Sequence, residues 1–211
     1  MTQAPTTTLP HILVILGSSR EHRFGGVVAH WFMRQTEQRT DMTFELADLR
    51  DWQHSYFRRA KPAAMSDYED DDEARRWAEV VGRADGFVIV SPEYNYGYPA
   101  VLKSALDSVY REWNRKPIAF VGYGGWDGGV RAMQQLREVS VELQMAPVRT
   151  SVVMQFGPRL FNAEGELKEP EMLDRQAARM LDDLAWWTHA LRAARDADEH
   201  PRRAEPLDRR S

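Results

Sequence analysis

HILVILGSSREHRFGG, residues 11–26, places a short apolar run directly before a loop of glycine, serine and arginine. The apolar run lacks the alternation of a half-exposed strand, which is typical of a parallel strand buried on both faces. A helical pattern follows the loop. The stretch therefore predicts a strand, a loop and a helix, and the recurrence of this unit along the chain decides the fold.

The same unit recurs five times in strict alternation. The predicted strands are Ile12–Leu16, Thr43–Ala47, Gly86–Val90, Ile118–Gly122 and Val148–Met154. The predicted helices are Gly26–Gln38, Asp70–Ala84, Ala100–Glu112, Gly129–Leu143 and Pro170–Ala194. This alternation favours an α/β fold in three layers, a doubly wound five-stranded parallel sheet with helices on both faces. The last helix carries a continuous apolar stripe, made of Leu173, Ala177, Met180, Leu184, Trp187 and Leu191.

The length of 211 residues suits one well-buried domain, which we expect over residues 11–194. Residues 1–10 and the charged residues 195–211 are expected to be flexible. The first residues lack the basic and apolar regions of a signal peptide, and no apolar run is long enough to cross a bilayer. We therefore expect a cytoplasmic protein with no membrane partner.

Composition excludes several classes of function. A formal net charge of −4 argues against a nucleic-acid partner, because such binders are usually basic. The absence of cysteine removes disulfides, thiolate metal sites and cysteine nucleophiles. The histidines lack metal-ligand spacing, and the acidic run DYEDDDE (67–73) is interpreted as a solvated helix start rather than as a metal site. Any electron transfer would need a bound cofactor.

The loop at residues 17–26 has the features of an anion site. In open parallel sheets, ligands bind beyond the carboxyl ends of the strands. The start of the following helix favours an anion, and Ser18, Arg20 and Arg23 add donors, while Gly25 allows close approach. The loop has neither the P-loop lysine pattern nor GxGxxG, which favours a terminal monophosphate. An ordinary tight turn is the alternative.

Two later loops are expected at the same edge of the sheet. Residues 91–107 hold three tyrosines in one short turn, which would offer stacking faces to a flat aromatic ligand or would lie in a subunit contact. Residues 122–137 begin with five glycines among eight positions. Backbone N–H groups of such a loop suit the pyrimidine end of a flavin, where negative charge builds up on reduction.

Together these loops make the sequence similar to the NAD(P)H-dependent FMN reductase family of flavodoxin-like proteins, which includes quinone, azo-dye and chromate reductases. GSSR resembles the family's GSxR phosphate segment. SPEYNYGYPAVLKSALD resembles its PEYN and LKNALD motif, and GGWDGGVRAMQQLR resembles its GGxxGGxRAxxQLR segment. The resemblance covers about residues 10 to 190 and implies the strand order 2-1-3-4-5.

Position by position, the resemblance implies an FMN site. The phosphate loop would comprise Ser18, Arg20, Arg23, Phe24 and Gly25. The ring and ribityl chain would be lined by Pro92, Glu93, Tyr94 and Asn95, with Tyr96 adjacent. The ring would be met from the other side by Tyr123, Gly124, Gly125 and Trp126. No side chain is nominated as catalytic, because the cofactor supplies the chemistry.

The resemblance also implies ping-pong hydride transfer from NAD(P)H, with NADPH expected over NADH, to a small-molecule acceptor such as a quinone or another flavin. It implies a homodimer or homotetramer. Arg58, Arg59 and Lys61 would attract an anionic substrate or the NADPH 2′-phosphate, or are simply solvated. The alternative function is an FMN-binding electron carrier or regulatory flavoprotein without NAD(P)H turnover.

Overall fold

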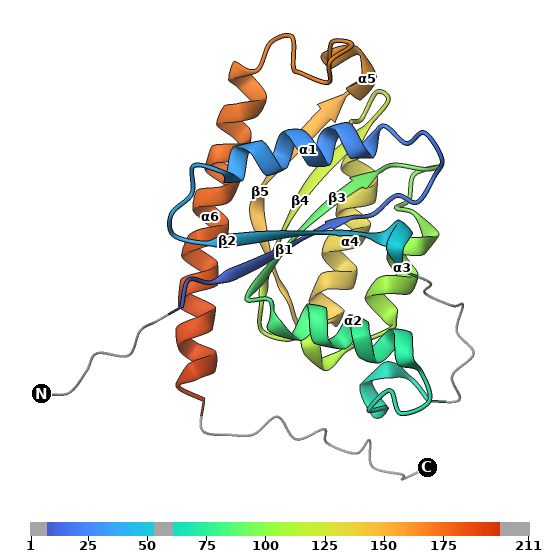
Figure 1. Cartoon of the computed structure of the whole chain (residues 1–211), viewed down its shortest axis with the longest axis vertical. Helices are drawn as coiled ribbons and strands as arrows, with labels where there is room; N and C mark the ends of the chain where they lie inside the picture. Colours follow the sequence, from blue (N-terminus) through green and yellow to red (C-terminus); the bar gives the residue numbers. More distant parts are fainter. Residues whose placement is uncertain (1–7, 53–60, 199–211) are drawn as a thin grey trace, which may run out of the picture.

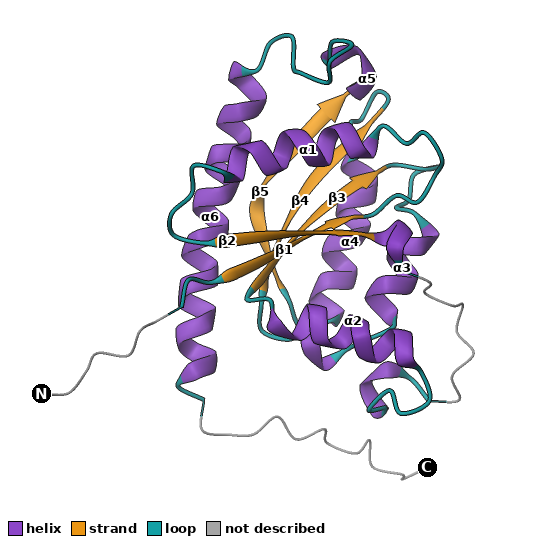
Figure 2. Cartoon of the chain, viewed as in Figure 1, coloured by secondary structure: helices purple, strands orange, loops and turns teal. Residues whose placement is uncertain are grey.

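The computed structural model, which describes residues 8–52 and 61–198, has one parallel sheet at its centre (Figure 2). Its strands are β1 (His11–Leu16), β2 (Thr43–Asp48), β3 (Gly86–Pro92), β4 (Pro117–Gly124) and β5 (Ala146–Gln155). Their order is β2-β1-β3-β4-β5, and every neighbouring pair is parallel. The predicted sheet and strand order are confirmed, with each strand one to three residues longer than expected.

Helices cover both faces of the sheet (Figure 1). They are α1 (Gly25–Thr36), α2 (Asp72–Arg83), α3 (Ala100–Asp107), α4 (Val130–Glu142), α5 (Gly157–Leu160) and α6 (Glu171–Asp196). The apolar core has two parts. In one, Val14 of β1 lies with residues of α1 and α6, and in the other, Ile15 lies with residues of α2, α3 and α4. Because helices cover both faces of the sheet, the side chains on both faces of its strands are buried, which explains why the strands are continuous apolar runs.

The third helix ends earlier than predicted. α3 stops at Asp107, and Arg111–Trp113 forms a separate 3₁₀ turn. The indole N–H of the buried Trp113 donates to the carbonyl oxygens of Leu106 and Val109, at 3.0 and 3.1 Å. The indole thus occupies carbonyl oxygens that would accept backbone N–H groups if α3 were longer. The predicted helix end at Glu112 is therefore wrong, and α3 ends five residues earlier.

The predicted apolar stripe of α6 is wrong at Trp187. Trp187 is 40% exposed, whereas Thr188 is fully buried. α6 passes close to the sheet here, since a Cβ at Gly86 of β3 would lie 3.1 Å from the Thr188 hydroxyl oxygen. Only a small side chain fits such an approach, and the Thr188 hydroxyl donates to the Leu184 carbonyl at 2.6 Å.

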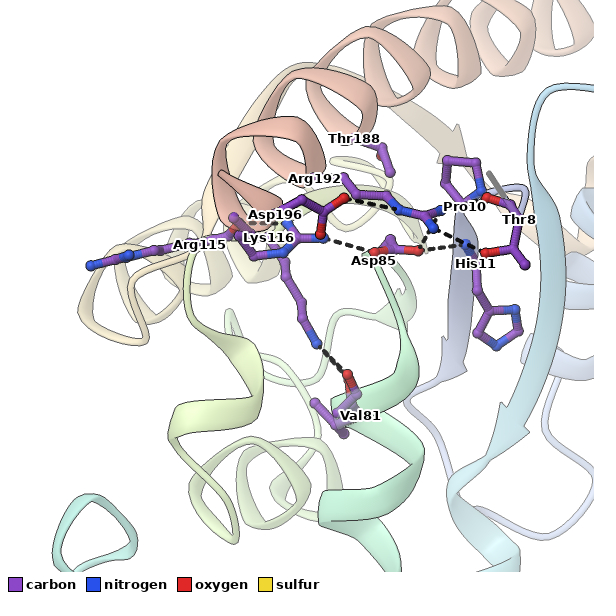
Figure 3. A network of polar contacts seen from close by, with 12 residues as sticks. Thr8, Pro10, His11, Val81, Asp85, Arg115, Lys116, Thr188, Arg192 and Asp196 are labelled. Carbon is purple, nitrogen blue, oxygen red and sulfur yellow. Dashed lines mark hydrogen bonds and ion pairs between the residues drawn. The ribbon is translucent and has the colours of Figure 1, made fainter. Parts of the chain in front are cut away.

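A charged network joins the end of α6 to the sheet (Figure 3). The Asp85 carboxylate accepts from Arg195 at 2.8 Å and from the backbone N–H of His11 at 3.1 Å. Arg192 lies 3.3 Å from the same carboxylate. The last helix, predicted to end at Ala194, therefore continues to Asp196, and Arg195 is anchored by this network.

The acidic run before α2 begins a helix, as predicted. Asp71 caps α2 by accepting from the backbone N–H of Ala74 at 2.9 Å, and Asp72 and Glu73 lie in its first turn. In the described part of the chain, no group of three or more His, Cys, Asp or Glu side chains could hold a metal ion. None of the helices described combines the length and apolarity needed to span a membrane.

Candidate functional site

The loops that follow β1, β3 and β4 lie together at the carboxyl edge of the sheet, on the right-hand side of Figure 1. The first two are in direct contact. The hydroxyl groups of Ser18 and Tyr94 are 2.8 Å apart, although 76 residues separate them in the sequence. The exposed Arg20 guanidinium lies 5.5 Å from the centre of the Tyr94 ring. The phosphate-loop residues predicted from the sequence are thus beside the predicted ring residues.

Arg23 points into the protein rather than toward solvent. Its guanidinium donates to the Ser18 carbonyl oxygen and forms an ion pair with Asp48, and its side chain is 8% exposed. Arg50 donates to the Arg20 carbonyl oxygen from the other side of the loop. These contacts hold the loop in shape, so within the described residues Arg20 is the arginine of this loop that is left facing outward.

The start of α1 leaves backbone donors available for an anion. Its cap residue, Phe24, makes no side-chain hydrogen bond, and its first turn holds no acidic residue. The Tyr123 hydroxyl packs against this turn so closely that a Cβ on Gly25 would lie 2.2 Å from it. Gly25 therefore sets how near α1 can approach β4.

Tyr123 of β4 brings its hydroxyl to the first turn of α1. Its hydroxyl lies under the phosphate loop, and the described residues provide it with no hydrogen-bond partner. Burial raises the pKa of Tyr123, which Ser18, Arg23 and Arg20 nearby lower only in part. The hydroxyl keeps its proton and remains a donor. Its polar end thus lies beside the proposed anion site, and its expected place at the ring stays a prediction.

Residues 94–97 form a tight turn after β3. The backbone N–H of Tyr94 donates to Gly97, and the N–H of Gly97 donates back, at 2.8 and 3.0 Å. Asn95 and Tyr96 between them have φ of 49° and 71°. Two left-handed residues in succession suit Asn but are unusual for Tyr. Tyr96 is 66% exposed, so strain is held at the open edge of the site.

The third loop is tied to this turn through Glu93. Its carboxylate accepts from the backbone N–H of Arg131 at 3.1 Å and from its guanidinium Nε at 3.2 Å. Asp127 forms an ion pair with the same guanidinium. The carboxylate of Glu93 is therefore committed to a protein contact, and the backbone of this turn is the part that can face a ligand.

Gly125 and Trp126 lie at the open end of the third loop. A Cβ at Gly125 would meet nothing within 4 Å. Trp126 is 80% exposed and forms a T-shaped pair with Phe156, with the ring centroids 4.9 Å apart. Gly124 is more enclosed, since a Cβ there would lie 3.2 Å from the Gly129 backbone nitrogen. The loop thus offers open backbone beside an exposed aromatic side chain.

Sequence reasoning missed several residues of this site. Asp48 ends β2 at the same sheet edge, so the rule that pointed to the three loops could also have found it. Arg131 is the first arginine of the segment that resembles GGxxGGxRAxxQLR, which could have pointed to it, whereas Arg50 and Phe156 carried no local signal. Of the predicted basic segment, Arg58 and Arg59 lie outside the described residues, and Lys61 is exposed.

Comparison with known proteins relates the chain to flavin enzymes. The family model for NADPH-dependent FMN reductase matches residues 10–158. An NAD(P)H-dependent FMN reductase of Schizosaccharomyces pombe is 38% identical over 148 residues, which is 69% of this chain and 74% of the relative. A 2-hydroxy-1,4-benzoquinone reductase of a Burkholderia species is 32% identical over 142 residues, 64% of this chain and 72% of that protein.

A solved structure agrees with the fold. The flavoenzyme NAD(P)H:(acceptor) oxidoreductase FerB of Paracoccus denitrificans superposes with a TM-score of 0.68 at 20% identity. The match covers 86% of this chain and 98% of the other. At this identity the likeness concerns the arrangement of sheet and helices.

Proposed function

The chain belongs to the NADPH-dependent FMN reductase family, and from that premise we propose that its three loops bind FMN and serve electron transfer from NAD(P)H to a quinone or a similar small acceptor. The observation that carries this proposal is the meeting of Ser18, Arg20 and Tyr94 at one edge of the sheet. Family membership gives the reaction class, and this contact joins an anion site to an aromatic one.

The phosphate end fits FMN in its donor set. An uncapped α1 without acidic residues in its first turn favours a dianion. The outward-facing Arg20 adds a charge-assisted donor. The buried Tyr123 hydroxyl, which has no hydrogen-bond partner among the described residues, lies against Gly25 in the first turn of α1. Ser18 is fully buried and its hydroxyl is already paired with Tyr94, so we propose that these hydroxyls act as a pair.

The ring end fits in shape. The proposed lining combines the backbone of the Glu93–Gly97 turn with the exposed backbone at Gly125 and the half-buried backbone at Gly124. Pro92, Tyr94, Asn95 and Tyr96 stay in the proposed lining, as do Phe24 at the phosphate loop and Trp126 at the open rim. Bound FMN would supply hydride and electron transfer, while the chain orients it and, through backbone N–H groups, favours the negative charge gained on reduction.

The proposal also covers the electron acceptor, the preferred nicotinamide nucleotide, the kinetic order and the oligomeric state. A quinone-type acceptor follows from the reductase activity that the Burkholderia relative is named for. The ping-pong order predicts parallel lines in double-reciprocal plots. A preference for NADPH, a homodimer or homotetramer, and a cytoplasmic location remain predictions from the sequence resemblance.

Anaerobic spectroscopy tests the proposed reaction. The purified protein reconstituted with FMN is expected to be yellow, to bleach on addition of NADPH and to regain its colour with a quinone. Bleaching by dithionite alone would point instead to the electron carrier. Failure of the protein to bind FMN at all would overturn the site assignment.

Arg20→Ala is expected to weaken FMN binding about tenfold, because it removes one charge-assisted contact from a partly solvated phosphate. The dissociation constant is measured from the quenching of FMN fluorescence. Riboflavin, which lacks the phosphate, provides a second probe, and its affinity should not change in the variant.

The matched control for this experiment is Arg149→Ala, at an exposed arginine of β5. It removes the same charge and should leave FMN affinity within about twofold of the wild type, since distant exposed charges are screened by salt. Equal losses in the two variants would show that Arg20 acts only through net charge.

A further inference from the structure

Arg131 is the residue through which the second and third loops are joined. Its backbone N–H and its Nε donate to the two carboxylate oxygens of Glu93, at 3.1 and 3.2 Å. Its guanidinium is paired with Asp127 and lies 3.8 Å from the centre of the Tyr96 ring. One side chain thus contacts the turn after β3 in two places and the loop after β4 in one.

The contact between Glu93 and Arg131 is partly shielded from water and is supported by a neighbouring residue of α4. The Glu93 side chain is 12% exposed and that of Arg131 is 33% exposed, so water competes only in part for the bond. Gln135, one helical turn further along α4, donates to the Tyr96 carbonyl oxygen at 3.1 Å. The first turns of α4 therefore hold the whole Glu93–Tyr96 segment, although the Glu93 and Arg131 positions are 38 residues apart in the sequence.

The planar guanidinium suits this task. It presents several N–H donors in a fixed fork and stacks on an aromatic ring, whereas the ammonium of lysine is a point charge on a flexible stem. Simultaneous contact with Glu93, Asp127 and Tyr96 uses both properties. Lysine could keep the positive charge but would lose the simultaneous geometry.

We propose that Arg131 is a positioning residue that sets the distance between the Glu93–Gly97 turn and the Gly124–Asp127 loop, and with it the gap that receives the flavin ring. The inference rests on the proposed FMN site. It assigns to Arg131 no contact with the cofactor, and its action goes through Glu93, Asp127 and Tyr96.

Two readouts separate this role from a purely structural one. Arg131→Ala is expected to weaken FMN binding about tenfold and to shift the midpoint potential of bound FMN to more negative values. The potential shifts because the Asp127 and Glu93 carboxylates lose their shared cation, which disfavours the negative charge gained on reduction. Arg131→Lys should restore the potential while restoring little of the affinity.

A second arginine of α4 serves as the control. Arg137 donates to the carbonyl oxygens of Val148 and Arg149, at 2.7 and 3.1 Å, and contacts neither loop. Arg137→Ala should lower the thermal midpoint but leave the FMN dissociation constant and the potential within error of the wild type. Glu93→Gln combined with Arg131→Ala should lose less affinity than the sum of the two single losses, since both act on one contact.

The outcomes are distinguishable from failure of the proposed function. If the wild-type protein does not bind FMN, the site itself is wrong. If the wild type binds FMN while Arg131→Ala shows unchanged affinity and potential, the positioning role is wrong and the site stands. The role is also wrong if Arg137→Ala weakens FMN binding as much as Arg131→Ala.

Discussion

Gly25→Ala is expected to weaken FMN binding by about 100-fold, because the loss of two hydrogen bonds to a charged phosphate, at about 1.5 kcal/mol each, has an effect of that size. The added Cβ would lie 2.2 Å from the Tyr123 hydroxyl oxygen and 3.1 Å from the Leu16 Cδ1. Neither neighbour can yield freely, since both are buried. The first turn of α1 must therefore move, and its N–H groups move away from the phosphate. Fluorescence titration with FMN measures the loss.

The neighbouring glycine is the matched control. A Cβ at Gly26 would meet nothing within 4 Å, so Gly26→Ala should bind FMN as the wild type does and should stabilise α1 slightly. The double variant Gly25→Ala/Tyr123→Phe removes the oxygen of the closest contact and should recover part of the affinity. Wild-type affinity in Gly25→Ala would show that α1 does not hold the phosphate.

Asp85→Ala is expected to lower the free energy of unfolding by about 3 kcal/mol, because it removes the shared carboxylate of a mostly buried network. Arg192 would keep the exposed Asp196 at 3.9 Å, and Arg195 would keep the Arg115 carbonyl oxygen, so neither replacement is as well placed. Two arginines, Arg192 and Arg195, and the backbone N–H of His11 would lose their shared acceptor. The Arg195 side chain is 11% exposed, so water replaces the carboxylate poorly. Urea unfolding followed by circular dichroism measures the change.

Asp182→Ala controls for the loss of an aspartate that pairs with arginine. Asp182 pairs with Arg39 at 2.5 Å but is 69% exposed, and removing such a pair should cost less than about 1 kcal/mol. Arg39 also keeps Asp41, which holds it at 2.7 Å. Similar losses in the two variants would contradict a special role of Asp85 in anchoring α6.

The parts of the site that could be predicted are those with a local cause. A loop between a buried strand and a helix is placed by the strand, so Ser18 and Arg20 could be assigned to the sheet edge from the sequence. Side-chain direction has no such local cause. Arg23 looks equivalent to Arg20 in the sequence, yet it turns inward because the last residue of β2, Asp48, lies within its reach.

The same limit explains the residues that were missed or misplaced. Arg131 follows a glycine-rich loop and looks like an exposed residue at the start of a helix. Its importance comes from Glu93, which the pairing of β3 with β4 brings beside it. Trp187 fits the apolar stripe by spacing, but the approach of α6 to Gly86 leaves room only for Thr188.

The sequence by itself determined the alternation of strands and helices, and through it the parallel sheet and the edge at which the loops meet, because burial on both faces and helical periodicity are properties of short segments. Only the tertiary structure decided how the loops are joined, namely that Tyr94 pairs with Ser18, that Arg131 holds Glu93, and that Tyr123 lies beneath Gly25. These contacts depend on distances between segments far apart in the chain, and the order of the strands sets those distances.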